Sequence, residues 1–274
     1  MDNYISTFLK GLWIGGTLTV PGVSGGSMAM ILGIYEQLID SINKLFHRDE
    51  KKKKSLLFLA VFTLGGLAGV VALSGVVAWL LKCFPAAMIF FFSGAVAGGI
   101  PAIFFEMRRE IFKWYHALYF VGGILLVVFL SMMPPGVFRI KSSFDINSML
   151  MQFFGGLIAA AALVLPGISV SHMLYVLGIY ESLIDAIASF DFLLILPFAI
   201  GGVIGIVLMA RAVSCLFQRW KTQTYLAILG FVIGSVFELI SGVSLHEISL
   251  FHLLIFFMGF FGIYLLFKKS NAGT

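Results

Sequence analysis

The chain has 274 residues, of which 60% are apolar and 11% charged, with 29 Phe, 30 Gly and a formal net charge of +5. Soluble domains carry roughly 25% charged residues, so this composition excludes a water-soluble protein and predicts one embedded in lipid. The basic residues flank apolar blocks and no Cys or His spacing suggests a metal site, so no nucleic-acid partner, metal or cofactor is expected.

The first expected element is an apolar segment that stops at Pro21-Gly22. Only about 13 apolar residues precede this proline, whereas a helix needs about 20 to cross a bilayer. Pro removes a backbone donor and Gly permits unusual dihedral angles, so the helix must end there. A new helix is expected from about Ser24. We therefore predict a re-entrant hairpin with the Pro-Gly motif at its tip.

Longer apolar blocks follow, and several reach the length of a membrane-spanning helix. These blocks lack the alternation of barrel strands, and backbone polar groups find no partners in lipid, so helices are expected. The sequence predicts an all-α, polytopic integral membrane protein. The blocks are Leu56–Leu81, Phe84–Phe105, His116–Met133, Phe192–Ala210, Tyr225–Phe237 and Leu250–Phe267.

An internal repeat organises these elements. The segment 21–42, PGVSGGSMAMILGIYEQLIDSI, matches 166–187, PGISVSHMLYVLGIYESLIDAI, at 13 of 22 positions without gaps. Four later glycines also recur at a constant offset of 136. They pair Gly65 with Gly201, Gly69 with Gly205, Gly94 with Gly230 and Gly98 with Gly234. We predict one membrane domain of two repeats, 1–139 and 140–274, each a broken hairpin followed by three spans.

The loop charges predict how the two repeats are oriented. Lys44–Lys54, Arg108–Lys113, Arg219–Lys221 and Lys268–Lys269 are basic, whereas the alternate loops hold few cations. This is a positive-inside pattern with both termini cytoplasmic. Three spans per repeat is an odd number, so the second repeat is expected to be inverted. A hairpin that crosses the membrane fully and returns gives the same parity, so the charge pattern allows both a re-entrant and a fully spanning hairpin.

Inverted repeats place their binding site near the midplane, where broken helices from opposite sides meet. The free N–H groups and positive dipole end of a helix that starts at each tip favour an anion, above all phosphate. The alternative is that the serines are ordinary N-caps and the glycines ease helix packing. The candidate site residues are Pro21, Gly22, Ser24, Gly25, Gly26, Ser27, Pro166, Gly167, Ser169, Ser171 and His172.

Two further side chains are candidates for the same site. His172 is either a satisfied buried histidine or a phosphate ligand or proton carrier. Arg211 is the only cation inside an expected span, which suggests a phosphate-attracting role. It also lies close enough to the cytoplasmic end for its side chain to snorkel to the headgroups.

Acidic residues recur between the repeats. Glu36 and Glu181 correspond, as do Asp40 and Asp185. Twelve residues, about 18 Å of helix, separate Ser24 from Glu36, which would place the acids at the membrane boundary. They are interpreted as interfacial helix ends paired with basic groups or as sites coupled to a proton or sodium. Glu238 lies near a span end and is assigned no role.

The motifs PGVSGGS and LGIYEQLI, echoed by PGIS and LGIYESLI, resemble those of a bacterial membrane family. This family was formerly described only as a domain of unknown function and is now described as the polyprenyl-phosphate transporters, the PopT group. The similarity extends over nearly the whole chain, to Gly230–Phe237. Ser27 replaces a usual Thr, and Val170 stands where the second motif often has Gly.

The resemblance implies a flippase in the bacterial cytoplasmic membrane rather than an enzyme. It would return undecaprenyl phosphate, the lipid carrier of cell-envelope synthesis, from the outer to the cytoplasmic leaflet, with the phosphate crossing between the tips and membrane lipid around the tail. One alternative is transport of a small soluble anion through the same tips. A lipid-pyrophosphate phosphatase is a second alternative, although the sequence has no Glu just upstream of the tip and no Arg in either tip.

Overall fold

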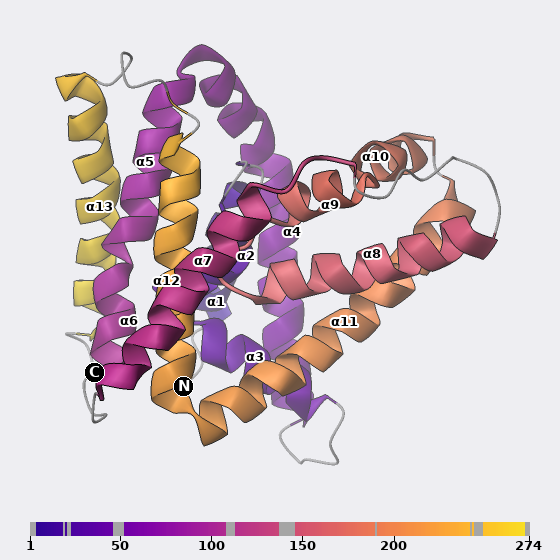
Figure 1. The fold of residues 1–274 in the computed structure, drawn as a ribbon, viewed down its shortest axis with the longest axis horizontal. Helices are drawn as coiled ribbons and strands as arrows, with labels where there is room; N and C mark the ends of the chain where they lie inside the picture. Colours follow the sequence, from indigo (N-terminus) through magenta and orange to yellow (C-terminus); the bar gives the residue numbers. More distant parts are fainter. Residues whose placement is uncertain are drawn as a thin grey trace.

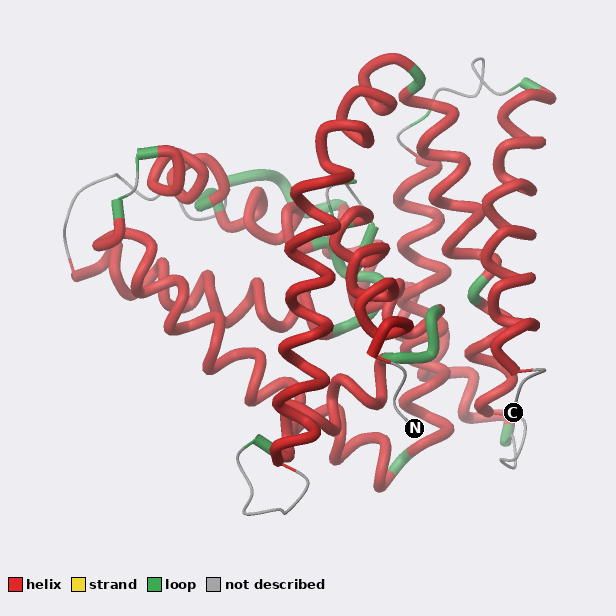
Figure 2. Tube along the Cα trace, turned by 180° about the vertical axis from the view of Figure 1, so that it is seen from behind, coloured by secondary structure: helices red, strands yellow, loops and turns green. Residues whose placement is uncertain are grey.

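The structure is a computed structural model that describes residues 4–18, 20, 23–45, 52–107, 113–136, 146–189, 191–241, 243 and 249–271. Its regular elements in these ranges are all helical, as predicted, and form a bundle with a projecting arm made by α8 to α11 (Figures 1 and 2). The helices are α1 (Tyr4–Thr17), α2 (Gly25–Ile31), α3 (Tyr35–Lys44), α4 (Lys52–Cys83), α5 (Pro85–Gly98), α6 (Ile100–Met107), the short 3-10 helix η1 (Trp114–His116), α7 (Ala117–Ser131), α8 (Ile146–Val164), α9 (Val170–Leu177), α10 (Tyr180–Ala188), α11 (Phe192–Arg219), α12 (Lys221–Ser241) and α13 (Leu250–Asn271).

Six helical segments of the described chain are long and apolar enough to cross a membrane: α4, α5 with α6, η1 with α7, α8, α11 and α12. The chain therefore has the multi-pass character that its composition predicted. α1 has only 14 residues, in keeping with the short first arm. α8, however, has 19 residues and is long enough to cross a membrane. The argument that the helix before the Pro-Gly motif is too short to cross therefore applies only to the first repeat.

Helix pairs are held together at glycines, because the missing side chain lets two backbones approach. α1 packs on α4, where a Cβ at Gly65 would lie 2.3 Å from the carbonyl oxygen of Phe8. α8 packs on α11, where a Cβ at Gly201 would lie 2.0 Å from that of Phe153. The recurring glycines are thus packing residues in both repeats.

The last helix of each repeat packs against the other repeat. α13 lies on α5 and α7 lies on α12, and these pairs again cross at glycines. A Cβ at Gly94 would lie 2.0 Å from the Phe256 carbonyl oxygen, and one at Gly230 would lie 2.2 Å from that of Phe120. Since 256 − 120 = 136, the two contacts obey the offset of the sequence repeat. The two repeats are therefore interlocked by a reciprocal exchange of their last helices.

Both hairpins bend at the same residue of the LGIY motif. Gly33 and Gly178 have φ of 64° and 72°, values that glycine adopts without steric cost. The bend between α9 and α10 is 106°. Each bend is followed by a helix that begins at a tyrosine, Tyr35 or Tyr180.

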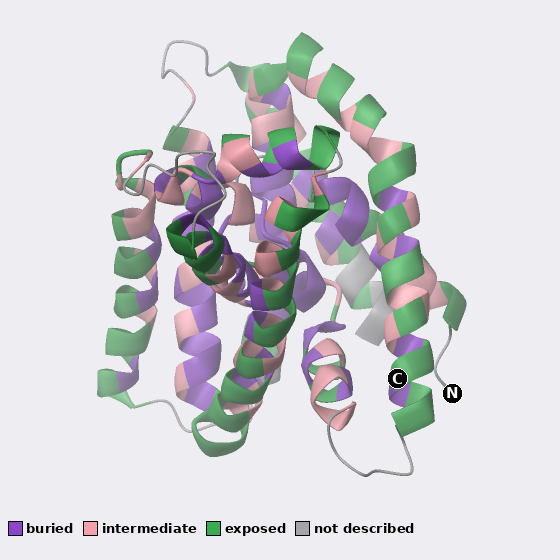
Figure 3. Cartoon of the chain, turned by 90° about the vertical axis from the view of Figure 1, so that its right-hand side faces the viewer, coloured by how far each residue is buried: buried purple, intermediate pink, exposed green. Residues whose placement is uncertain are grey.

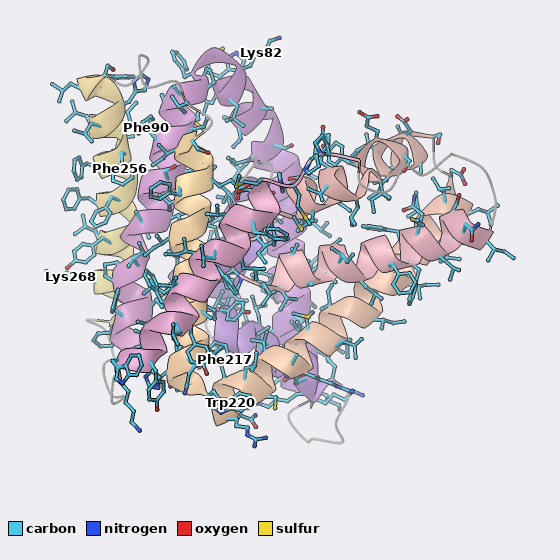
Figure 4. All side chains as sticks on the ribbon, viewed as in Figure 1. Lys82, Phe90, Phe217, Trp220, Phe256 and Lys268 are labelled. Carbon is cyan, nitrogen blue, oxygen red and sulfur yellow. The ribbon has the colours of Figure 1, made fainter. Side chains whose placement is uncertain are left out.

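Buried residues and the charged helix ends occupy different parts of the bundle. Buried residues gather at its centre, around α2, α3, α5 and α12, whereas the outer faces of the long helices are exposed (Figure 3). The junction of α11 and α12, with Trp220 between Arg219 and Lys221, lies at one end of the bundle, and Lys82 at the opposite end (Figure 4). Residues 46–51 and 108–112 of the other predicted basic loops lie outside the described residues, as do Arg139 and Lys141.

Candidate functional site

The first tip lies against the second motif. Ser24 is the N-cap of α2, with φ −89° and ψ 131°, and its Oγ accepts a hydrogen bond from the Ser27 amide at 3.5 Å. The same hydroxyl donates to the carbonyl of Leu165 at 3.4 Å, one residue before Pro166. Ser24 of the first tip is therefore in direct contact with the residue that precedes Pro166. The Ser27 hydroxyl is buried beside this contact and has no hydrogen-bond partner in the described part of the chain.

Glycine at the first tip allows this contact. A Cβ at Gly26 would lie 2.9 Å from the carbonyl oxygen of Val164 and 3.0 Å from the nitrogen of Pro166. A Cβ at Gly25 would meet the side chain of Leu18 at 2.9 Å. Chain atoms thus occupy the space beside both glycines. Pro21 and Gly22, also predicted here, lie outside the described residues.

The second tip has the same cap but a different setting. Ser169 is the N-cap of α9, and its Oγ accepts from the His172 amide at 3.3 Å. The hydroxyls of Ser169 and Ser171 lie 3.2 Å apart. Gly167 has φ of 82°, and a Cβ there would lie 2.3 Å from the Phe231 carbonyl oxygen. Only glycine fits this turn, because both the dihedral angle and the adjacent α12 backbone exclude a side chain.

An open cavity of about 580 Å³ lies in front of the second tip; we call it the second-tip cavity. It is lined by residues of both repeats: Leu18 and Val20 after α1, together with α4 and α5, come from the first, and α9 with its N-cap, together with α10 and α12, from the second. Hydroxyl, imidazole and carboxyl groups converge on it among aliphatic side chains. It is lined by Leu18, Val20, Leu81, Ile89, Ser169, Ser171, His172, Tyr175, Tyr180, Glu238 and Leu239.

His172 and Glu238 form the charged part of this cavity. The Nε2 atom of His172 lies 3.1 Å from the carbonyl oxygen of Leu130, and Nδ1 lies 4.0 Å from Oε1 of Glu238. A carbonyl can only accept, so Nε2 carries a proton in this contact. Protonation of Nδ1 as well would place a cation beside the Glu238 carboxylate. The pair can therefore present either a net negative or a neutral face to an anion.

The first-repeat acids lie in a second polar cavity, of about 470 Å³, which we call the Glu36 cavity. Glu36 accepts a hydrogen bond from the Tyr225 hydroxyl, and Asp40 forms an ion pair with Lys44. The Lys221 ammonium lies 5.8 Å from the centre of the Tyr225 ring. The cavity is lined by Glu36, Gln37, Ile39, Asp40, Ser214, Phe217, Gln218 and Lys221.

The remaining predicted residues are dispersed. Glu181 and Asp185 are exposed on α10, and Arg211 is exposed on α11. None of the three lines the second-tip cavity or the Glu36 cavity. The described residues contain no cluster of three His, Cys, Asp or Glu side chains that could hold a metal ion.

Three features of the site escaped the sequence analysis. Glu238 reaches the second tip from α12, which no local motif could reveal. Tyr35 donates to the Val164 carbonyl at 2.9 Å and so fastens the first hairpin to α8. His116 and His252 are also repeat partners, at the offset of 136, and the Nδ1 of each accepts from the amide three residues earlier. The constant offset could have found this last pair.

Comparisons with known proteins agree on one family. The family model described as VCA0040-like, undecaprenyl phosphate translocase-like, matches residues 14–254. A polyprenyl-phosphate transporter of Vibrio cholerae is 29% identical over 245 residues, 85% of this chain and 77% of the relative. A polyprenyl-phosphate transporter of Staphylococcus aureus is 30% identical over 262 residues, 92% of each chain. No solved structure matches the chain.

Proposed function

The chain belongs to the undecaprenyl phosphate translocase-like family, and on that premise we propose that it moves polyprenyl phosphate between the two leaflets of the bacterial cytoplasmic membrane. The expected direction is from the outer to the cytoplasmic leaflet. The observation that carries the proposal is the second-tip cavity, a space between the repeats on which hydroxyl, imidazole and carboxyl groups converge. Its substrate group would be the phosphate, with the isoprenoid chain outside it.

The chemistry of the cavity suits a phosphate monoester. The amide groups at the start of α9 and the hydroxyls of Ser169 and Ser171 are donors at a positive helix end. His172 adds a third donor when it is doubly protonated. Such charge-assisted hydrogen bonds are stronger than those between neutral groups. They would replace part of the water that a phosphate loses on leaving the headgroup region.

Glu238 links the binding of phosphate to the protonation of the cavity. Its carboxylate lies in the same cavity as the proposed phosphate, and two like charges at close range in a partly dry site repel each other. A proton on His172 or on Glu238 removes that repulsion. We therefore favour a proton over sodium as the coupling ion, and this pair over Glu36, Asp40, Glu181 and Asp185 as the place where it binds.

The unequal state of the two tips supports transport by alternating access. The second tip faces an open cavity, whereas the first tip is closed by Ser24, by Tyr35 and by the bond between Tyr225 and Glu36. With inverted repeats and cytoplasmic termini, the open side is the outer one. Exchanging the states of the two hairpins would then expose the phosphate to the cytoplasm.

The cavity geometry supports transport over hydrolysis. A serine nucleophile needs a base within hydrogen-bond reach. Among the described residues the two ring nitrogens of His172 face Leu130 and Glu238, and no hydrogen bond joins that ring to a serine hydroxyl.

Purified protein in liposomes carrying a fluorescent polyprenyl phosphate tests the proposal. An external quencher reports how fast the inner-leaflet lipid becomes accessible, and free phosphate is assayed in the same tube. We expect faster loss of protection than in empty liposomes and no phosphate release. If the inner-leaflet lipid stays as protected from the quencher as in empty liposomes, with pH gradients imposed in either direction, the protein is not a flippase. Released phosphate would point to an enzyme, and uptake of inorganic phosphate alone to a soluble-anion transporter.

A further inference from the structure

A groove of about 480 Å³ lies between α1, α4, α5 and α13, on the lipid-facing side of the bundle; we call it the first groove. Thr17 is its one hydroxyl-bearing residue, and that hydroxyl donates to the Ile14 carbonyl at 2.8 Å. Phe84, Phe251 and Met258 on its rim are 55%, 59% and 61% exposed. The groove is thus apolar throughout and open to the hydrocarbon of a membrane.

A second groove, of about 340 Å³, occupies the equivalent place in the other repeat, between α7, α11 and α12. Eight residues that line the first groove have a counterpart at an offset of 136 that lines the second. They pair Val77 with Val213, Leu80 with Leu216, Phe84 with Trp220, Ala87 with Gln223, Met88 with Thr224, Phe91 with Ala227, Phe92 with Ile228 and, in reverse order along the chain, Ile255 with Tyr119.

Two polar side chains that distinguish the second groove form hydrogen bonds within the protein. Thr224 donates to the Trp220 carbonyl at 2.8 Å, and the Gln223 amide nitrogen lies 3.5 Å from Nε2 of His116. The substitutions that distinguish the second groove from the first therefore leave its wall largely apolar. A feature that is kept in both repeats through different side chains indicates a shared use rather than a packing defect.

Each groove shares a wall with a polar cavity. On α4, Leu80 faces the first groove and Leu81 the second-tip cavity; on α5, Met88 and Ile89 do the same. On α11, Leu216 faces the second groove and the next residue, Phe217, faces the Glu36 cavity. Each polar cavity therefore lies beside an apolar groove.

We propose that the two grooves hold the isoprene units nearest the phosphate, the first groove in the present state and the second groove after the hairpins exchange states. This inference rests on the proposed function. Its basis is complementarity: a polyprenyl phosphate has one charged group attached directly to a long apolar chain, and each of the two polar cavities is backed by one apolar groove. The rest of the chain stays in the bilayer.

The test fills the grooves one at a time. Leu80→Trp and Leu216→Trp place an indole in the first and second groove, and Val76→Trp, on an exposed position of α4 outside the grooves, is the control. We expect each groove variant to slow polyprenyl phosphate transfer in liposomes by roughly tenfold, through overpacking of a site that the chain must enter. Val76→Trp should retain the wild-type rate.

A photoreactive polyprenyl phosphate, with the reactive group on its first isoprene unit, identifies the occupant directly. Crosslinks on α4, α5 or α13 that unlabelled polyprenyl phosphate suppresses would support the proposal. Equal labelling by a photoreactive phosphatidylglycerol would mean that the grooves bind lipids in general and would overturn the proposal. A wild-type rate of polyprenyl phosphate transfer in both Leu80→Trp and Leu216→Trp would also overturn it. If wild-type protein moves no polyprenyl phosphate but crosslinks at the groove, the proposed transport fails and the binding site stands.

Discussion

The first hairpin, α2 with α3, and the second, α9 with α10, share 13 of 22 residues, the serine cap and the glycine bend, yet they lie in opposite environments. Tyr35 is 3% exposed and bonded to Val164, whereas its partner Tyr180 lines an open cavity and stacks on Tyr175 with ring centres 4.2 Å apart. A repeated sequence therefore specifies the hairpin itself, and the residues around each hairpin determine whether it is closed or open.

Those surrounding residues differ between the repeats. Tyr225, which donates to Glu36, has Ile89 as its counterpart, so Glu181 lacks an equivalent donor at that position. Glu238, which faces His172, has Ala102 as its counterpart. The two sides of a transporter with this sequence would be closed by different bonds, and each can be weakened without touching the other.

The largest effect is expected where the second hairpin depends on one residue. Gly167→Ala forces a side chain into a positive-φ position and against the Phe231 carbonyl, which should cost about 2–4 kcal/mol of stability. The melting temperature of the purified protein in detergent measures this. Gly75→Ala is the control, because a Cβ there meets no atom within 4 Å. Equal melting of the two variants would contradict the described turn.

Serine substitutions test whether the open tip and the closed tip differ in phosphate binding. Ser171→Ala removes a hydroxyl from the second-tip cavity and should weaken binding of polyprenyl phosphate roughly tenfold, the effect of one charge-assisted hydrogen bond. Ser27→Ala removes a buried hydroxyl that has no partner in the described structure, so it should leave that affinity unchanged and raise the melting temperature. Titrations that follow fluorescence quenching in detergent compare the two affinities for polyprenyl phosphate. If Ser27→Ala rather than Ser171→Ala weakens binding, the first tip and not the second binds the phosphate.

Much of this site could be predicted from the sequence because it is local. The N-caps Ser24 and Ser169 and the break at each Pro-Gly motif follow from residue types in consecutive positions. The glycines at the offset of 136 likewise revealed equivalent helix contacts. The open and closed states could not be predicted, because they depend on Glu238 and Tyr225, which reach the hairpins from α12 through tertiary packing.

The closing bond of the first hairpin can be removed alone. Tyr35→Phe keeps the ring and deletes the donor to the Val164 carbonyl, which should shift the balance toward an open first side by about 1 kcal/mol, or roughly fivefold. Alkylation of an added Ser27→Cys by a water-soluble maleimide should quicken accordingly. Tyr180→Phe, at the repeat partner, should not change the rate. If Tyr35→Phe does not increase the alkylation rate of the added cysteine, other contacts keep this side closed.

Glu238 tests the electrostatic difference between the cavities. Glu238→Gln removes the negative charge beside His172 and should tighten polyprenyl phosphate binding by roughly threefold at neutral pH, since repulsion in this partly exposed site is screened. The gain should shrink as the pH falls, because protonation neutralises the same charge in the wild type. Glu181→Gln, on the exposed face of α10, provides the matched control. A gain that stays constant across pH would assign the effect to packing.

The smallest effect is expected at Arg211, the cation whose counterpart in the first repeat is Gly75. Its side chain is exposed on α11 and lines neither polar cavity, so the phosphate path between the tips does not pass it in this state. Arg211→Gln should therefore change the transfer rate less than about twofold, as is usual for an exposed charge. The liposome assay measures the rate, with Ser171→Ala in parallel. If the arginine variant is the slower of the two, the phosphate follows the outer face of α11, and the contact between the tips is only structural.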